Sequence, residues 1–291
     1  MTSVPLPHNP FKAALKDAVA AAAAGANPAD RPQLKGLWIA MGSPTSIEIA
    51  AEIGYDWLLI DGEHGPNDLT GILAQLRACH GYPTTPIVRP PAADPVLVKQ
   101  VLDLGAQTLL VPMVNTREEA ELMVRAVEYA PTGIRGVGGV IARSGRWGLI
   151  PDYMATARDE ICLIVQVESR EALDNIDDIA SVDGIDGIFI GPADLSASLG
   201  HPDDAGAIQD EIRRAFDVIA SHGKAIGSLA FDPATARKYF EWGASFVAVA
   251  GDTDVYVRGL AAELAQYGSS PLGSPCQGSW RRSRLRGSQE G

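Results

Sequence analysis

Residues 57–90 read WLLIDGEHGPNDLTGILAQLRACHGYPTTPIVRP, and this stretch decides the fold. An apolar run, WLLI, leads into a polar turn, then into a helical pattern, and then into a second apolar run, PIVRP. Short runs that are apolar throughout are typical of strands buried on both faces of a parallel sheet. The stretch therefore predicts one strand–helix–strand unit, the repeating element of α/β folds.

The same alternation continues in both directions along the chain. Apolar runs occur at 36–41, 57–60, 86–90, 108–114, 161–167, 187–190, 225–230 and 246–250. Helical patterns follow at 44–53, 68–79, 94–104, 116–129, 170–180, 206–221, 233–242 and 254–266. Eight such units predict an α/β fold of the closed (β/α)8 type, a TIM barrel. The alternative is an open doubly wound sheet, but its usual Gly-rich phosphate turn is absent from the segment after the first strand, 41–44.

These patterns divide the chain into three parts. Residues 1–33 contain an Ala-rich helical stretch and a linker, and they lack the basic and apolar regions of a signal peptide. Residues 34–267 form the predicted catalytic barrel, interrupted at 133–160 by a long segment rich in Gly and Arg. Long loops of this kind are often functional. Residues 268–291 are rich in Gly, Ser, Pro and Arg, which predicts a disordered basic tail.

Charge and cysteine content exclude several classes of protein. The net charge is -12, and because the tail carries four Arg and one Glu (+3), residues 1–267 carry -15. A body this acidic repels phosphate backbones, so we expect no nucleic acid partner. No apolar run reaches the roughly 18 residues of a membrane helix, so we expect no membrane partner. The well-separated Cys79, Cys162 and Cys276 indicate a reducing compartment, the cytoplasm, and no disulfide framework.

Polar residues stand at the carboxyl ends of several predicted strands, where the active sites of barrels of this type lie. They are Asp61 and His64 after the second strand, Arg89 at the end of the third, Gln166 and Glu168 on the fifth, and Ala193-Asp194 after the sixth. Each one has a structural explanation as well: Asp194 as a helix cap, Arg89 as an ion-pair partner, His64 as a loop histidine. Their convergence on one rim favours a shared site.

The types of residue on this rim point to a reaction. Glu168 and Asp194 are hard oxygen ligands, which suit Mg²⁺, Mn²⁺ or a similar ion. Such an ion binds a 2-oxo acid such as pyruvate and stabilises the enolate that forms when a proton leaves C3. Arg89 can donate to the same oxygen, and His64, oriented by Asp61, is a candidate base. We therefore predict proton abstraction beside a carbonyl, with formation or cleavage of a carbon–carbon bond.

The lysines disfavour the other main aldolase mechanism. The chain has six, and none follows the carboxyl end of a predicted strand: Lys12, Lys16, Lys35, Lys99, Lys224 and Lys238. A Schiff-base aldolase needs a lysine nucleophile in its site. The sequence therefore favours enolate chemistry on a metal over imine chemistry.

Seven segments carry a resemblance to a known family: GLW (36–38), YDWLLIDGEHGPND (55–68), PIVRP (86–90), QTLLVPMV (107–114), GIRGVGG (133–139), VQVESREAL (165–173) and DGIFIGPADLSASLG (186–200). They resemble the class II pyruvate aldolases of the HpcH/HpaI type. That resemblance implies a divalent metal ion (Mg²⁺, Mn²⁺ or Co²⁺) and cleavage of a 4-hydroxy-2-oxo acid to pyruvate or hydroxypyruvate and an aldehyde. It also implies a role in aromatic catabolism, and a homohexamer in which the last barrel helix, 254–266, is exchanged between subunits.

The resemblance also implies a role for each rim residue. His64 matches the catalytic base, Asp61 its partner, and Arg89 the arginine that contacts the pyruvyl oxygen. Glu168 and Asp194 match the metal ligands. Two further matches concern substrate binding: Gln166 near the metal, and the backbone of Ala193 and Asp194 around the pyruvate carboxylate.

Two other functions stay open at this point. A related barrel lyase acting on an acyl-CoA or phosphoenolpyruvate needs a basic groove, for which the long loop offers Arg135, Arg143 and Arg146. These arginines equally fit an acidic acceptor aldehyde, or a solvated or interfacial position. A non-catalytic barrel that serves only as an assembly subunit predicts a degraded rim, whereas all the rim residues above are present.

Overall fold

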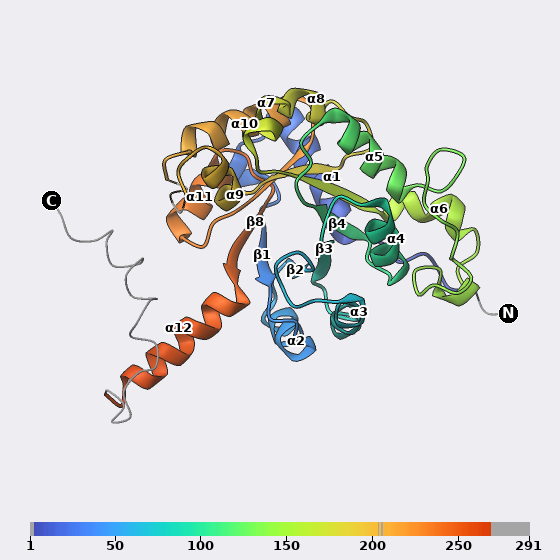
Figure 1. Cartoon of the computed structure of the whole chain (residues 1–291), viewed down its shortest axis with the longest axis horizontal. Helices are drawn as coiled ribbons and strands as arrows, with labels where there is room; N and C mark the ends of the chain where they lie inside the picture. The colour runs from blue at the N-terminus through green and yellow to red at the C-terminus, as the bar shows by residue number, and fades with distance from the viewer. Residues whose placement is uncertain (1–2, 203, 205, 269–291) are drawn as a thin grey trace. The chain divides into compact units, whose positions relative to one another are not determined.

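Eight parallel strands close into a barrel in sequence order, β1 beside β2 and so on until β8 pairs with β1 (Figure 1). The structure is a computed structural model that describes residues 3–202, 204 and 206–268. The strands are β1 Leu34–Ile39, β2 Trp57–Asp61, β3 Thr85–Arg89, β4 Thr108–Val111, β5 Cys162–Val167, β6 Gly187–Ile190, β7 Ala225–Leu229 and β8 Phe246–Gly251. The predicted TIM barrel is confirmed, and the open sheet is excluded.

Helices connect the strands on the outside of the barrel. They are α2 Pro44–Ile53, α3 Leu69–Ala78, α4 Pro95–Asp103, α5 Arg117–Val127, α6 Tyr153–Glu160, α7 Arg170–Asp174, α8 Ile176–Ala180, α9 Pro192–Ser198, α10 Gln209–Ser221 and α11 Pro233–Glu241. Several begin at side-chain caps that the sequence predicts. Asp94 accepts from the amide of Val96, and Asp232 accepts from the amide of Thr235. Such caps satisfy backbone donors that have no partner inside the helix.

Aromatic side chains fill the barrel interior, and glycines make room for them. Trp57 and Phe246 are almost fully buried, with ring centroids 5.9 Å apart. A Cβ atom at Gly36 would lie 2.1 Å from the Trp57 ring, and one at Gly227 would lie 2.2 Å from the Phe246 ring. The two glycines are therefore required by close packing inside the barrel.

The elements depart from the predicted pattern in four places. The fourth strand ends at Val111 rather than 114, because Pro112 has no amide proton for the ladder and Met113 has a φ of 52°. The helix predicted over 170–180 divides at Asn175, whose side chain donates to the carbonyl of Asn115. The segment 133–160 contains α6 instead of being a loop throughout. A short helix, α9, follows β6.

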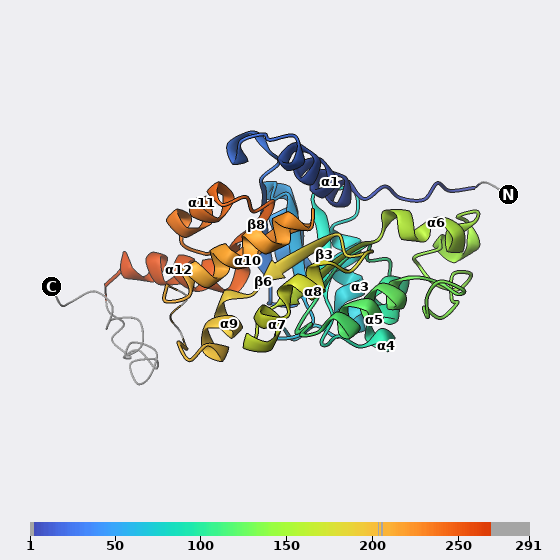
Figure 2. The same cartoon turned by 90° about the horizontal axis from the view of Figure 1, so that it is seen from above.

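An additional helix, α1 (Pro10–Ala23), lies across the amino-terminal end of the barrel (Figure 2). Phe11 from α1 packs edge-on against Phe246 with ring centroids 5.4 Å apart, and Leu15 is buried in the same cluster. This end of the barrel is thereby closed by apolar side chains. The open end is the opposite one, where the carboxyl ends of the strands lie.

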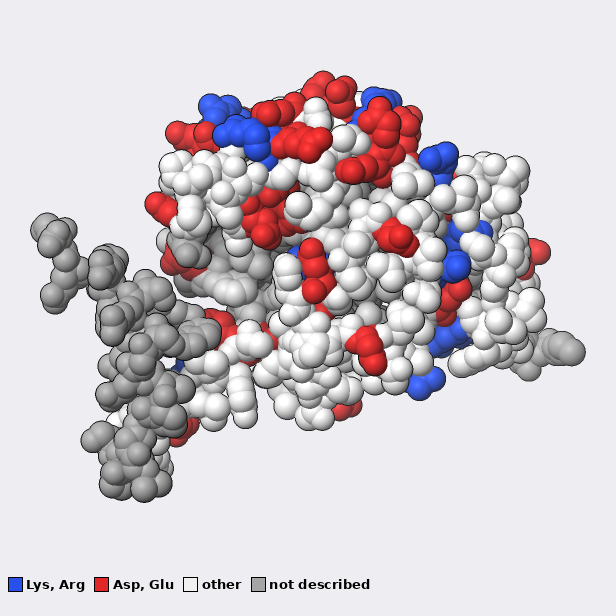
Figure 3. Space-filling model, viewed as in Figure 1, with Lys and Arg blue, Asp and Glu red and all other residues white. Residues whose placement is uncertain are grey.

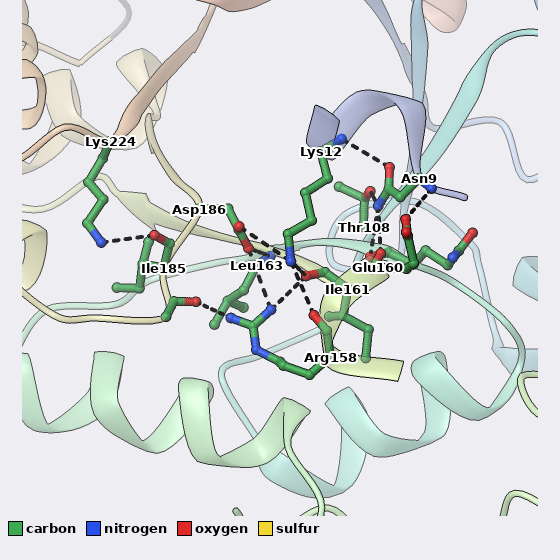
Figure 4. A network of polar contacts seen from close by, with 12 residues as sticks. Asn9, Lys12, Thr108, Arg158, Glu160, Ile161, Leu163, Ile185, Asp186 and Lys224 are labelled. Atoms are coloured by element: carbon green, nitrogen blue, oxygen red, sulfur yellow. Dashed lines mark hydrogen bonds and ion pairs between the residues drawn. The ribbon is translucent and has the colours of Figure 1, made fainter. Parts of the chain in front are cut away.

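A polar network holds α1 in place (Figure 4). Lys12 Nζ donates to the carbonyl of Ile161 at 2.6 Å and to that of Arg158 at 3.2 Å, and it lies 3.6 Å from a carboxylate oxygen of Asp186. Asn9, which caps α1, donates to the hydroxyl of Thr108 at 2.9 Å. Burial lowers the pKa of Lys12, although the nearby Asp186 opposes this shift.

We expect Lys12→Met to destabilise the protein by about 1–3 kcal/mol, because two buried carbonyls lose their donor. Lys16→Met, on an exposed position of the same helix, is the control and should stay within about 0.5 kcal/mol of the wild type. Urea unfolding followed by circular dichroism measures both. Equal midpoints for the two variants would show that the Lys12 contacts contribute nothing.

The chain forms two compact units, one ending at Asp252 and the other beginning at Thr253. The first unit contains helix α1, which lies within the helix and linker predicted over 1–33, together with the barrel. The second unit contains most of α12 (Asp252–Ala265). The predicted disordered tail lies outside the described residues from 269 onward. Within the described part of the chain, no helix is long and apolar enough to cross a membrane.

Candidate active site

Asp61 and Arg89 form a buried ion pair at the carboxyl ends of β2 and β3. They are register partners on the adjacent strands. Arg89 Nε donates to Asp61 Oδ1 at 2.9 Å and Nη2 donates to Oδ2 at 2.6 Å, while Trp38 Nε1 donates to Oδ2 at 2.9 Å. Burial by itself raises the pKa of Asp61, but Arg89 and Trp38 outweigh it, so the pKa is below its usual value. Asp61 is therefore held as a carboxylate, and it fixes the guanidinium at the rim.

His64 stands at the mouth of the barrel with a largely exposed ring. Its Nε2 lies 3.8 Å from Glu63 Oε2, and Glu63 in turn lies 2.7 Å from Nη1 of Arg89. Asp61 accepts from the backbone amide of His64 at 3.3 Å. The contacts of the described residues include none between Asp61 and the imidazole ring. Asp61 thus orients the turn that carries His64, whereas the sequence predicts an orienting contact with the ring.

A buried amide pair holds the turn after β2. Asn67 Nδ2 donates to the carbonyl of Asp61 at 2.6 Å, and Gln75 Nε2 donates to Asn67 Oδ1 at 2.6 Å. Gln75 is fully buried on α3. Gly65 lies in the middle of the turn, where a Cβ atom would be only 2.6 Å from the Asp61 carbonyl oxygen. The residues between Asp61 and Asn67 are therefore held in one conformation beside the rim.

Glu168 is as deeply buried as Asp61, with 2% of its surface exposed. Its Oε1 accepts from the backbone amide of Met113 at 2.9 Å, and its Oε2 accepts from Gln166 Nε2. A Cβ atom at Gly191 would lie 2.4 Å from Glu168 Oε2, so only glycine leaves space for the carboxylate. Gln166 Oε1 is also buried and has no hydrogen-bond partner among the described residues.

Three carboxylates raise the local negative charge at this end of the barrel. Asp194, exposed in the first turn of α9, interacts electrostatically with both Glu63 and Glu168. Burial, together with the charges of Asp194 and Glu63, raises the pKa of Glu168 to about 7, against the opposing effects of Met113 and Arg89. No group of three or more His, Cys, Asp or Glu side chains in the described ranges is arranged to hold a metal ion by itself.

The raised pKa of Glu168 predicts a pH dependence for the metal-free protein. Because the folded-state value of about 7 exceeds the ordinary value of 4.5, the folded protein binds more protons than the unfolded chain between these pH values. In EDTA, the free energy of unfolding should therefore fall as the pH rises from 4.5 to 7, by up to about 3 kcal/mol. Urea unfolding at pH 5 and pH 7.5 measures the difference. Glu168→Gln should remove most of this difference in the free energy of unfolding. If the difference persists in this variant, other titratable groups cause it.

All six lysines lie away from the rim, as the sequence predicts. Lys12 lies at the opposite end of the barrel, and Lys224 Nζ, just before β7, donates to the carbonyls of Val182 and Ile185. The long-loop arginines are also at that end. Arg135 pairs with Asp103 at 3.2 Å, and Arg143 donates to the carbonyl of Leu104, just before β4 begins. Within one chain these arginines do not form the basic groove that an acyl-CoA or phosphoenolpyruvate site at the rim needs.

Comparison with known proteins identifies the family. The model of the HpcH/HpaI aldolase/citrate lyase family matches residues 34–259. The chain belongs to this family. A hydroxypyruvate/pyruvate aldolase from Deinococcus radiodurans is 54% identical over 243 residues, covering 81% of this chain and 86% of that protein. A 2-keto-3-deoxy-L-rhamnonate aldolase from Klebsiella pneumoniae is 55% identical over 236 residues, covering 80% and 88%.

A solved structure supports the same assignment. The crystal structure of an HpcH/HpaI aldolase/citrate lyase family protein from Burkholderia cenocepacia matches with a TM-score of 0.81 and 38% identity, covering 90% of this chain and 100% of that one. The resemblance noted in the sequence is thus confirmed. This member of the HpcH/HpaI family is an aldolase, a carbon–carbon lyase that acts on a small molecule.

Three groups that contact the rim residues of this aldolase are not among the site residues predicted from the sequence. Trp38 binds Asp61 and lies under Arg89, whose Cζ is 4.7 Å from its ring centroid. Glu63 forms an ion pair with Arg89, and the amide of Met113 donates to Glu168. Glu63 stands between Asp61 and His64 in the sequence, which is a signal that could have identified it. The backbone amide of Met113 has no such signal, because any residue type supplies one.

Proposed function

We propose that this chain is a divalent-cation-dependent aldolase that cleaves 4-hydroxy-2-oxo acids to pyruvate or hydroxypyruvate and an aldehyde. The observation that carries the proposal is the rim itself. One buried guanidinium and two interacting carboxylates, Glu168 and Asp194, lie beside an exposed imidazole at the open end of the barrel. This combination offers an anion contact, cation ligands and a base within one site.

The residues present fit a hard divalent cation. Glu168 and Asp194 provide oxygen ligands, and Mg²⁺ commonly uses only one or two protein carboxylates while waters and substrate complete its coordination. The unpartnered Oε1 of Gln166 and the raised pKa of Glu168 both indicate a site that is incomplete without a cation. When bound there, the cation supplies Lewis-acid polarisation of the 2-oxo group.

Residues of the chain itself bind the substrate and move the proton. Arg89 donates hydrogen bonds to the carbonyl oxygen as negative charge develops on it, because Asp61 and Trp38 already hold the guanidinium in place. The backbone amides of Ala193 and Asp194, in the first turn of α9, have no partner within that helix and can donate to an anion such as the substrate carboxylate. His64 removes the proton of the 4-hydroxyl group, directly or through a water, as the C3–C4 bond breaks.

The named relatives support a donor and an acceptor class. One of them is named for hydroxypyruvate and pyruvate, and another for 2-keto-3-deoxy-L-rhamnonate, a sugar acid whose cleavage gives pyruvate and a hydroxyaldehyde. We therefore propose pyruvate or hydroxypyruvate as the donor and a small hydroxyaldehyde as the acceptor. The aromatic catabolism expected from the resemblance is less well supported, because neither relative is named for an aromatic breakdown product.

The test is release of pyruvate from 2-keto-3-deoxy-L-rhamnonate, with a coupled lactate dehydrogenase assay. We expect EDTA to abolish cleavage and Mg²⁺, Mn²⁺ or Co²⁺ to restore it. Sodium borohydride with pyruvate should leave the enzyme active, since no lysine lies at the rim. Full activity in EDTA, or inactivation by borohydride, would contradict the cation mechanism.

The proposal extends to assembly and compartment. Helix α12 exposes Val255, Val257, Leu260 and Leu264, and exposed apolar side chains of this density are typical of an interface. We propose the homohexamer implied by the family resemblance, with α12 exchanged between subunits. Leu260→Glu should reduce the mass measured by light scattering.

The buried free thiols of Cys79 and Cys162 support a cytoplasmic location.

A further inference from the structure

A cavity of about 300 Å³ lies at the amino-terminal ends of β3 and β4, the opposite end of the barrel from the rim. Four parts of the first unit supply most of its lining: residues 6–10 at the start of α1, residues 79–86, residues 105–107, and residues of the segment 143–161. Its volume is at the lower end of the range for ligand sites. No residue of the proposed active site contributes to its lining.

The cavity is basic in a chain that is strongly acidic overall. Its lining includes Arg143, Arg146, His8 and His80 and contains no Asp or Glu, although acidic residues outnumber Lys and Arg in the chain by 36 to 24. Of these four, His8 is paired with Glu160 at 3.3 Å. Figure 3 shows basic side chains grouped over the region of α4 and α6 on one face of the molecule, and a second basic group at its upper left, among more numerous acidic side chains.

The two arginines are not neutralised by carboxylates. Arg143 Nη1 donates to the carbonyl of Leu104 at 2.9 Å, and Arg146 has no side-chain hydrogen bond or ion pair among the contacts of the described residues. Burial lowers the pKa of Arg143, and the charges of Arg146 and Arg77 add to this effect. Like charges that are held together without a counter-ion indicate a missing anion.

Two hydroxyl groups point to the same conclusion independently. Thr84 and Ser144 both line the cavity, and the hydroxyl oxygen of each is buried without a hydrogen-bond partner in the described part of the chain. Thr84 is only 6% exposed. Buried hydroxyls nearly always have a partner, so an unpaired one calls for an explanation. Both hydroxyls belong to the same lining as the two arginines, so an acceptor bound in the cavity is a candidate partner for all four side chains.

We propose that this cavity binds a phosphate group, either free or carried by a small metabolite of a few carbon atoms. A phosphate offers three terminal acceptor oxygens and close to two negative charges, which match two guanidiniums and two hydroxyls. A carboxylate carries only one negative charge, and so it balances only one of the two guanidiniums. The cavity is too small to enclose a nucleotide. The site is separate from the rim, and it does not depend on the proposed aldolase reaction.

Isothermal titration calorimetry of the full chain in EDTA tests the proposal, because removal of the cation takes away one of the groups through which the rim can bind an anionic probe. The probes are inorganic phosphate, 3-phosphoglycerate and glycerate. We expect one molecule of a phosphate-bearing probe to bind per chain. Glycerate should bind at least about tenfold more weakly. Tighter binding of 3-phosphoglycerate than of phosphate identifies a phosphorylated metabolite, and equal binding identifies free phosphate. Binding of neither, or of glycerate equally well, overturns the proposal.

Two variants assign the binding to this cavity. Arg146→Met and the isosteric Thr84→Val should each weaken phosphate binding by about tenfold or more. Arg214→Met, on an exposed position of α10, is the matched control and should bind like the wild type. Cleavage of the 2-oxo acid should be unchanged in all three variants, so a failure here is distinct from a failure of the aldolase proposal. Unchanged phosphate binding in both cavity variants overturns the assignment.

Discussion

Arg89→Met is expected to lower kcat/KM for cleavage of the 2-oxo acid by about 10³-fold. The guanidinium is 4% exposed and held by Asp61, Glu63 and the Trp38 ring. Its removal takes away the donor to the developing negative charge. It also leaves the buried Asp61 and the half-buried Glu63 without their counter-charge, which should destabilise the fold by about 3–5 kcal/mol.

The experiment must separate lost chemistry from lost folding. Far-ultraviolet circular dichroism at the assay temperature identifies conditions in which the variant is folded, and cation binding measured there should persist. Arg89→Lys keeps the charge but not the two-pronged hydrogen bond to Asp61, so only part of the activity should return. Arg117→Met, which breaks an exposed pair with Glu121, is the control. A folded Arg89→Met variant with kcat/KM within tenfold of the wild type would refute the assigned role.

Glu168→Gln is expected to weaken divalent cation binding by at least about tenfold and to abolish cation-dependent cleavage. The amide keeps the shape of the side chain and can still accept from the Met113 amide. What it lacks is the negative charge. Because burial disfavours that charge in the absence of a cation, the metal-free variant should be more stable than the wild type at pH 7.5.

Titration with Mn²⁺, followed by electron paramagnetic resonance, measures the affinity directly and does not depend on activity. Glu171→Gln, an exposed glutamate of α7 three residues further along, is the matched control and should bind Mn²⁺ like the wild type. If Glu168→Gln binds Mn²⁺ with unchanged affinity, Glu168 is not a cation ligand.

Much of the rim is predictable from the sequence because a barrel obeys a simple geometric rule. Each strand ends at the same face, so the residue after each apolar run can be assigned to that face without coordinates. Asp61, Arg89 and Glu168 were placed in this way. The contacts among them were not predictable, since the strand register that makes Asp61 and Arg89 neighbours depends on the closure of the barrel.

The long loop shows where pattern reasoning is insufficient. Its arginines were candidates for an acceptor or nucleotide site, because a Gly- and Arg-rich insertion carries no information about which end of the barrel it reaches. The structure brings Arg143 to the carbonyl just before β4 and so to the closed end. The cavity there depends on residues from four separate parts of the chain, which no local pattern relates.

The sequence by itself determined the class of fold, the face of the barrel that carries the chemistry and the family, because periodicity and motifs are local properties of the chain. The tertiary structure alone decided the partners of each charge. It assigned Asp61 to Arg89 rather than to the His64 ring, and it surrounded Glu168 with enough low-dielectric protein and negative charge to raise its pKa to about 7. Burial and electrostatic energy depend on distances between residues remote in sequence, and those distances exist only once the barrel has closed.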